Sequence, residues 1–348
     1  MNGYNRIRSA FEGTTPDTVP IMLHNFQLAA REAGFTQEKF RNDARCVAEA
    51  FIKSVETYRY DGIYVEIDTA TLAGALNAEV RFRLDEPALA FRGCLKDWKD
   101  IEKCKSVDIS GYKYIQVWLA SVRLLRDYFK DEIFIRGNCD QAPFSLASML
   151  RGMQKWFLDL YDNDHRDQVF ELLEFCADVC SQFVGMMAQA GAHGISNGDS
   201  VAGPTMVSPE VYQKFALPFE RRVIMKAHEY GLPYILHICG DTTKILDQMP
   251  ASGADGIELD YLTDARKARA AFKNNVVFSG NIDPSGVLTA GTPDEVKKAV
   301  YRLLSEFSGT PKFILCSGCS IPPSAPPENI KAFISAGREF HNRYSELH

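Results

Sequence analysis

The chain has 348 residues, of which 46% are hydrophobic and 24% charged, with a formal net charge of −6. This composition is ordinary for a globular protein, and its acidic balance disfavours nucleic acids and anionic membrane surfaces as partners. The sequence has no run of 18 apolar residues and no signal-peptide segment, and its nine cysteines are irregularly spaced, so we expect a cytoplasmic protein without a transmembrane helix or a disulfide framework.

Eight short apolar runs of β type alternate along the chain with segments of helical periodicity. They lie at 19–24, 62–68, 132–138, 194–199, 234–239, 256–260, 276–281 and 313–318. Repeated strand–helix units form a parallel sheet, and eight such units favour a closed barrel over an open sheet. We therefore predict an α/β protein with one domain over residues 1–348, a single (β/α)8 TIM barrel preceded by an N-terminal helical extension.

The span between the second and third predicted strands, 69–131, is long enough to hold an insertion. It contains LNAEVRF and ALAFRG, which we interpret as a small hairpin over the barrel mouth. Farther along the chain, Ser208, Pro209 and Glu210 have the residue types of a helix N-cap and first turn. Pro218 then falls inside a helical pattern and should kink or break that helix.

Polar side chains follow most of the predicted strands, at the point where each strand ends. In barrel enzymes the catalytic residues collect at this carboxyl end, and polar groups buried there are costly unless they are paired or functional. The set comprises His24, Glu66, Asp68, Asn138, Asp140, Asn197, Asp199, His237, Cys239, Glu258, Asp260, Asn281, Asp283, Cys316 and Cys319.

The sequence His237-Ile238-Cys239 ends the fifth predicted strand. Because strand side chains alternate, His237 and Cys239 face one side and Ile238 packs on the other, against helices. Imidazole nitrogen and thiolate sulfur both suit Zn²⁺, and the Cys316-Ser-Gly-Cys319 segment after the eighth strand could supply a third ligand. Three protein ligands and one open position are typical of catalytic zinc.

Other interpretations of these residues stay open. A buried His237 and Cys239 could be core residues, and Cys316 with Cys319 could form a redox pair. If all four side chains held one metal ion, the site would be closed and structural.

The segment LHICGDTTKILDQMPASGADGIELD resembles the uroporphyrinogen decarboxylase superfamily, and specifically its zinc-dependent methylcobamide:thiol methyltransferase branch. The resemblance covers nearly the whole chain, and its last two segments together with HIC are the more specific ones. The other segments that carry it are RIRSAFEGTTPDTVPI, DGIYVEIDTATLAGALNAEVRF, GNCDQAPFSLASML, GDSVAGPTMVSPEVYQKFALPFERRVI, FSGNIDPSGVLTAGTPDEVKKAV and CSGCSIPPSAPPENIKAFISA.

The resemblance implies a zinc site that falls on His237, Cys239 and Cys319, with Cys316 ranked second. It also implies a (β/α)8 barrel and two cofactors, Zn²⁺ and a methylated corrinoid (cobalamin) presented by a separate corrinoid-binding protein. The implied reaction moves a methyl group between that protein and a small, coenzyme M-like thiol. This chemistry is consistent, because the thiolate is the nucleophilic form and coordination to zinc deprotonates a thiol.

Six more residues at the strand ends are assigned roles in this interpretation. We expect Asp68, Asp199 and Glu258 to be catalytic, and a carboxylate such as Glu258 or Asp260 to take up the thiol proton. We expect His24, Asn281 and Asp260 to bind substrate.

The alternative is a uroporphyrinogen decarboxylase-type lyase acting on a porphyrinogen or another carboxylated substrate. The decarboxylases have an arginine-rich N-terminal loop for substrate carboxylates, whereas here IMLHNFQLAAREAG follows Pro20 and no such cluster is present. A third reading is a non-catalytic protein that docks a corrinoid protein or senses a metal. The sequence does not name the methyl acceptor or the upstream donor, and a homo-oligomer stays open.

Overall fold

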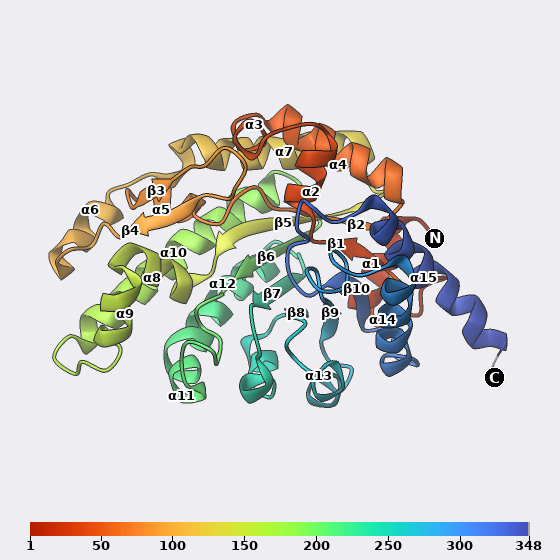
Figure 1. Ribbon diagram of the computed structural model, residues 1–348. Coiled ribbons are helices and arrows are strands. Elements are labelled where there is room, and N and C mark those ends of the chain that lie inside the picture. The colour runs from red at the N-terminus through yellow and green to blue at the C-terminus, as the bar shows by residue number, and fades with distance from the viewer. Residues whose placement is uncertain (347–348) are drawn as a thin grey trace.

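Eight parallel strands form the central sheet of the computed structural model, which describes residues 1–346; the last two residues of the expected domain, 347–348, lie outside this range. All eight predicted strands are confirmed (Figure 1). In spatial order they are β1 (Met22–Leu23), β2 (Gly62–Val65), β5 (Phe134–Gln141), β6 (Gly194–Gly198), β7 (Tyr234–Ile238), β8 (Gly256–Leu259), β9 (Val277–Ile282) and β10 (Phe313–Ser317).

The two ends of this sheet meet, so the sheet closes into a barrel. Ile21, just before β1, forms a parallel bridge with Leu315 in β10, and the Leu315 N–H donates to the Pro20 carbonyl at 2.9 Å. The (β/α)8 barrel predicted from eight strand–helix units is therefore confirmed.

Helices surround the strands and form the outer layer of the barrel (Figure 1). Helix α1 precedes the first strand and confirms the N-terminal helical extension. The connection between β7 and β8 contains only short 3₁₀ turns. The helices are α1 (Gly3–Glu12), α2 (Phe26–Glu32), α3 (Gln37–Asn42), α4 (Ala44–Tyr58), α5 (Thr71–Ala75), α6 (Ile101–Lys105), α7 (Lys113–Phe129), α8 (Pro143–Arg151), α9 (Met153–Asp159), α10 (Arg166–Gln189), α11 (Pro209–Val211), α12 (Leu217–Glu229), α13 (Ala265–Phe272), α14 (Pro293–Glu306) and α15 (Pro327–Glu346).

The helix boundaries follow the local sequence. The Ser208 side chain accepts a hydrogen bond from the Val211 N–H at the start of α11, as its N-cap position predicts. Pro218 lies in the first turn of α12 and is preceded by a π-helical segment, Tyr212–Ala216. The run from Pro209 to Glu229 stays helical, so the predicted break does not occur. The π-helical segment is the irregularity that precedes the proline, which has no N–H to continue the ladder.

The insertion between β2 and β5 contains a two-stranded antiparallel hairpin, β3 (Glu79–Arg81) and β4 (Leu89–Arg92), which lies at the left of Figure 1. The Ala88 N–H at its base donates to the Asp68 carboxylate, just beyond β2. The hairpin is thereby attached to the carboxyl end of the barrel, where the sequence predicted it.

Side chains inside the barrel change character from one end to the other. At the amino end, the interior layer is apolar and contains Met22, Phe134 and Ile314, against which α1 packs Ile7. Two residues farther along these strands, the interior contains Arg136 and Cys316, because residues two apart point to the same side. The polar residues therefore begin in the middle of the barrel and continue to its carboxyl end.

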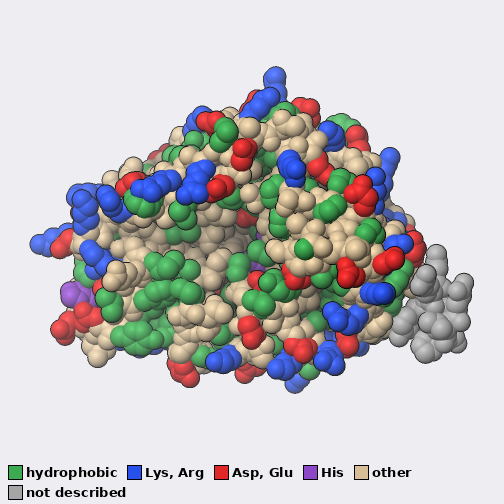
Figure 2. All heavy atoms as spheres, in the orientation of Figure 1, with side chains coloured by type: hydrophobic (Ala, Val, Ile, Leu, Met, Phe, Trp, Pro, Cys, Tyr) green, Lys and Arg blue, Asp and Glu red, His purple; other side chains and the backbone are tan. Residues whose placement is uncertain are grey.

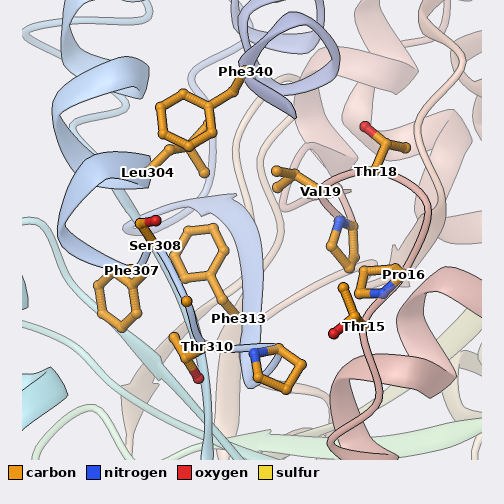
Figure 3. Close-up of a pocket in the computed structure, with 13 residues that line it drawn as sticks. Thr15, Pro16, Thr18, Val19, Leu304, Phe307, Ser308, Thr310, Phe313 and Phe340 are labelled. Carbon is orange, nitrogen blue, oxygen red and sulfur yellow. The ribbon is translucent and has the colours of Figure 1, made fainter. Parts of the chain in front are cut away.

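An apolar pocket of about 290 Å³ lies at the amino end, outside the barrel. It separates the loop before β1 from the end of α14 and the start of β10, and Figure 3 shows rings such as Phe307 and Phe313 on one side, with Pro16 and Val19 on the other. Within residues 1–346, none of the helices combines the length and apolar character needed to cross a membrane.

Candidate functional site

Three potential metal ligands meet at the carboxyl end of the barrel. His237 is the second-last residue of β7, Cys239 directly follows that strand, and Cys319 lies just beyond β10. One ligand atom from each lies within 4.8 Å of the others, and His237 Nε2 is 3.1 Å from Cys239 Sγ. Ile238 is fully buried among the hydrophobic core, as strand alternation predicts. These three residues could hold a metal ion.

A backbone contact fixes the orientation of the His237 ring. Its Nδ1 lies 3.1 Å from the carbonyl oxygen of Glu258 on the neighbouring strand β8, so Nδ1 carries the hydrogen and donates it. Nε2 is then the nitrogen that faces Cys239. A second hydrogen bond of this kind is the usual way in which proteins orient a metal-binding histidine.

Without a metal, the three side chains form a charged cluster. Contact with the Cys319 thiol and with His237 holds the pKa of Cys239 well below its usual value, although burial opposes this. Burial alone would lower the pKa of His237, but the Cys239 thiolate raises it to about 10. The pKa of Cys319 is raised by its contact with Cys239 and by burial. These shifts favour the thiolate form of Cys239, which is the form that binds a metal ion.

A cavity of about 160 Å³ opens beside this cluster. Cys239 and Cys319 are only partly buried and line it, so a metal held there would have one side facing the cavity. Ser200 also lines the cavity, with its Oγ 3.5 Å from Cys239 Sγ. The polar lining also includes His24, Glu66, Asn138, Asp140 and Gln141.

His24 connects two carboxylates across the barrel. Its Nε2 lies 2.5 Å from Glu66 Oε2, and its Nδ1 lies 3.0 Å from Glu258 Oε1. Burial alone would lower the pKa of His24, but the two carboxylates raise it. His24 is thus an imidazolium that faces the cavity with Glu66 while Glu258 lies fully buried below it.

Arg136 completes this network from beneath. Its Nη1 donates to Glu258 Oε2, its guanidinium carbon lies 3.8 Å from the centre of the Tyr64 ring, and both Arg136 and Glu258 are fully buried. Burial alone would raise the pKa of Glu258, but Arg136 and His24 hold it well below its usual value. Both carboxylate oxygens of Glu258 are therefore bonded, and Glu258 supports His24 and His237 from below.

An irregularity in β5 turns polar side chains toward the cavity. The register between β5 and β6 shifts between Asn138 and Gln141, and Asp140 has a φ of +61°. Such bulges re-aim side chains near active sites, and aspartate is one of the few residue types that adopt a positive φ readily. Asn138, Asp140 and Gln141 consequently all line the cavity.

The structure places five of the predicted site residues away from the cavity lining: Glu258, which lies below it, and Asp68, Asp199, Asp260 and Asn281. Asp68 pairs with Arg41 and accepts the Ala88 N–H. Asp199, fully buried, accepts the Ser145 N–H at 2.7 Å.

Asp260 accepts the Gly240 and Leu262 N–H groups, and Asn281 donates to the Asp260 and Thr263 carbonyls. These two residues organise loops around the mouth. Their assigned substrate-binding roles stay predictions.

Two features of the site were not assigned from the sequence. Arg136 stands in the apolar run EIFIRGN, and a charged residue inside an otherwise apolar strand was the available signal. The second is the pairing of Glu66 with His24, which lie 42 residues apart and meet only because the barrel brings β1 beside β2.

Cys316 lies in the middle layer of the barrel and not among the three clustered ligands. It is fully buried, and burial raises its pKa to about 12. Among the described residues, the metal-like cluster comprises His237, Cys239 and Cys319 alone.

Comparisons with known proteins agree with this architecture. The chain is 30% identical to a methylcobamide:CoM methyltransferase of Methanosarcina mazei, over 71% of this chain and 70% of the relative. It is 26% identical to a uroporphyrinogen decarboxylase of Hydrogenovibrio crunogenus, over 92% of this chain and 90% of the relative. The solved structure of a methyltransferase from Methanosarcina mazei has the same fold, with a TM-score of 0.88 and 20% identity, and covers 98% of this chain and 99% of that one.

The model of the uroporphyrinogen decarboxylase (URO-D) family matches residues 3–340. The match spans the barrel from α1 into α15, and thus all the residues of the candidate site. The chain belongs to the uroporphyrinogen decarboxylase (URO-D) family and is an enzyme of the methyltransferase type within it.

Proposed function

We propose that the protein is a zinc-dependent methyltransferase that moves a methyl group between a methyl-corrinoid protein and a small thiol. The observation that carries this proposal is the cluster of His237, Cys239 and Cys319 beside a small cavity at the barrel mouth. The methyltransferase relatives support the same class of reaction.

The donor set suits zinc. One imidazole nitrogen and two sulfurs are ligands that Zn²⁺ prefers, and three protein ligands with an open fourth position are the arrangement of catalytic zinc sites. His237, Cys239 and Cys319 would hold the ion. When bound, it would supply the Lewis acidity that keeps a substrate thiol deprotonated near neutral pH.

In the proposed reaction, the S–H bond of the substrate breaks and a proton leaves. The thiolate sulfur then forms a bond to the methyl carbon. The electron pair of the cobalt–carbon bond stays on cobalt, which changes from Co(III) to Co(I). The products are a methyl thioether, a Co(I) corrinoid and one proton, so atoms and charge balance.

Within this proposal, Glu66 and Asp140 are the carboxylates of the cavity lining that could receive the proton. The Glu66 oxygens are bonded to the His24 ring and to the Asn138 amide, whereas Asp140 Oδ1 has no partner among the described residues. The other two carboxylates considered from the sequence are occupied, since Glu258 is bonded to Arg136 and His24. The oxygens of Asp260 accept backbone N–H groups.

The corrinoid would approach over an apolar rim next to the cavity. A cavity of about 150 Å³ accommodates a ligand of benzene size, so a corrin macrocycle does not enter a space of about 160 Å³. A second, largely apolar pocket shares Thr69 with the cavity, and its lining includes Leu89, Phe91 and Met153, which are 53%, 42% and 50% exposed. Figure 2 shows hydrophobic side chains gathered at the lower left of this face, over α8 and α9.

The decarboxylase alternative lacks a matching substrate pocket. A porphyrinogen with many carboxylates needs cationic partners and a large cavity, whereas the residues described as lining this one include no lysine or arginine. The small volume and the cysteine ligands both favour methyl transfer to a small thiol.

The test measures methyl transfer from methylcobalamin to a panel of small thiols by the purified, zinc-loaded protein. We expect thioether and Co(I) to form in equal amounts, and the reaction to stop when zinc is removed by a chelator and to resume when it is restored. Conversion of uroporphyrinogen III to coproporphyrinogen, with no transfer to any thiol, would establish the decarboxylase instead.

A further inference from the structure

Apart from the imidazoles of His24 and His237, the described residues that line the cavity beside Cys239 supply no cationic side chain. Among the described residues that line it, none is a lysine or arginine. The His24 imidazolium is already shared between Glu66 and Glu258, at 2.5 and 3.0 Å. An anionic group that entered this cavity would therefore find no unshared positive charge.

Four buried side-chain atoms in the cavity lining have no partner among the described residues. One is the Ser320 hydroxyl oxygen, and the other three are the acceptor oxygens Asn138 Oδ1, Asp140 Oδ1 and Gln141 Oε1, on residues that are 2%, 1% and 8% exposed. The Asn138 amide nitrogen donates to Glu66 Oε1 at 3.2 Å, which leaves its oxygen as the free end. Buried acceptors without partners are costly, so a ligand or water must supply hydrogen-bond donors here.

Asp140 is the acidic member of this group. Its Oδ2 accepts the Leu72 N–H at 2.7 Å, while Oδ1 has no partner, and the charged neighbours that act on it, Asp68 and Glu66, are both acidic. Burial and these two carboxylates raise its pKa to about 7. Backbone N–H groups already favour the ionised form of this carboxyl group, and a cation brought to it would stabilise that form further.

The charges around the cavity otherwise cancel. Glu66 and Glu258 are matched by His24 and Arg136, and Asp68 is matched by Arg41. Asp140 is left as the one carboxylate of the lining without a cationic partner among residues 1–346. The shift in strand register between Asn138 and Gln141 brings all three acceptor side chains to the same wall.

From these contacts we infer that the methyl acceptor is a small thiol whose other end is positively charged, such as a protonated amine, held by Asp140 and Asn138. This inference rests on the proposed function and adds to it the chemical class of the acceptor. The sulfur would face His237 and Cys239, and the ammonium group would donate to the unpartnered oxygens. A thiol that ends in a sulfonate or carboxylate would instead meet Asp140 and the acceptor oxygens.

Three two-carbon thiols that differ only in the end group test this inference: 2-aminoethanethiol, 2-mercaptoethanol and 2-mercaptoethanesulfonate. With methylcobalamin as donor, we expect kcat/KM to decrease in that order, by about 10-fold or more between ammonium and hydroxyl, as for the loss of a hydrogen bond to a charged group. A sulfonate or hydroxyl thiol that reacts as well as the ammonium thiol would overturn the inference.

The Asp140→Asn variant tests whether Asp140 causes the preference for the ammonium thiol. The three thiols differ in intrinsic reactivity. For each thiol we therefore take the ratio of kcat/KM in the wild type to kcat/KM in the variant, because the intrinsic difference cancels in this ratio. The ratio should be about 10 or more for the ammonium thiol and close to one for the hydroxyl thiol. Asp283→Asn, which removes a carboxylate that lines a different cavity, is the matched control and should leave all three ratios near one.

A binding measurement separates this inference from the proposed function. The S-methyl products of the same three thiols are titrated into the protein by calorimetry, with no donor present. If the ammonium product binds best and loses affinity in Asp140→Asn while no methyl transfer occurs, the binding of the ammonium group by Asp140 stands and the proposed function fails. If methyl transfer occurs and the sulfonate product binds best, the proposed function stands and the inference fails.

Discussion

The two ends of the barrel are built from the same eight strands but have opposite chemistry. On β10, Ile314 belongs to the apolar layer against α1, Cys316 lies one layer higher, and Cys319 faces the cavity just beyond the strand. On β5 the same progression runs from Phe134 through Arg136. Since the strand geometry is the same at both ends, the difference shows where the fold uses polar residues for chemistry and where it uses apolar residues for stability.

Among substitutions at the two ends of the barrel, those of the proposed metal ligands should have the largest effect on zinc binding and activity. Replacing Cys239 or Cys319 by alanine should lower zinc affinity by more than about 100-fold, since loss of even an outer hydrogen-bonding partner of a ligand costs 10–100-fold. Methyl transfer should fall with it. Metal content by mass spectrometry and activity with methylcobalamin measure the two effects.

Cys316→Ala is the matched control, because Cys316 belongs to the same segment but lies one layer below the cluster. It should keep about one zinc ion per chain, the content of a three-ligand catalytic site. If Cys239→Ala kept its zinc and Cys316→Ala lost it, the assignment of ligands would be wrong.

The middle layer should show the largest effect on stability. Glu258→Gln leaves the fully buried Arg136 without its carboxylate, and breaking a buried ion pair in this way costs about 3–5 kcal/mol. The free energy of unfolding is measured by urea denaturation. The double variant Arg136→Met with Glu258→Gln removes both charges and should recover part of that loss. If the double variant lost as much unfolding free energy as the single variants Arg136→Met and Glu258→Gln lose together, the two residues would not be coupled.

The contrast between the ends also explains what the sequence could predict. All eight strands were predictable because each begins with a short apolar run of β type and is separated from the next by a segment of helical periodicity or a turn, and the pairing of His237 with Cys239 followed from strand alternation. The bridging of Glu66 and Glu258 by His24 was not predictable, because it joins three strands across the barrel. Contacts of this kind depend on strand order and side-chain direction, which no local pattern specifies.

Position at a strand end was likewise insufficient to identify a cavity residue. Asp260 and Asn281 follow β8 and end β9 as expected, yet their side chains bond to loop backbone groups. Conversely, Asp140 reaches the cavity through a positive φ and a register shift in β5, neither of which leaves a clear mark in the sequence. Which strand-end residues face the cavity is decided by loop conformation.

Asp140, at the carboxyl end of the barrel, should make the free energy of unfolding depend on pH. Its pKa is raised to about 7, so the folded protein holds a proton between about pH 4 and 7 that the unfolded chain has released. Stability from this group therefore decreases as pH rises through that window, by on the order of 2–4 kcal/mol. Asp140→Asn removes this decrease, so the variant should gain stability relative to wild type between pH 5 and 8. A difference in unfolding free energy that does not change with pH would contradict the raised pKa.

A smaller effect is expected at the apolar rim, which is exposed yet belongs to the functional end. Leu89→Asp places a charge where the corrin ring is proposed to lie, and should raise KM for methylcobalamin by about 10-fold while KM for the thiol stays the same. Met225→Asp on α12, where the side chain is 58% exposed, is the matched control. Equal effects of the two substitutions on KM would mean that the rim is not the corrinoid surface.

The smallest effect is expected at the amino end, where Ile314→Val removes one methyl group from the apolar layer packed against α1. The substitution leaves the strand and its register intact, so the cost should be about 0.5–1.5 kcal/mol of unfolding free energy, as for other buried isoleucines. Zinc content and kcat/KM should stay at the wild-type values, because a shift at this layer would have to pass through the Arg136–Glu258 pair to reach His237. Urea denaturation and the methylcobalamin assay on the same preparation test both halves of this expectation. A loss of activity larger than the loss of stability would mean that the apolar end also positions the site, and that the division of the barrel into a stabilising end and a functional end is too simple.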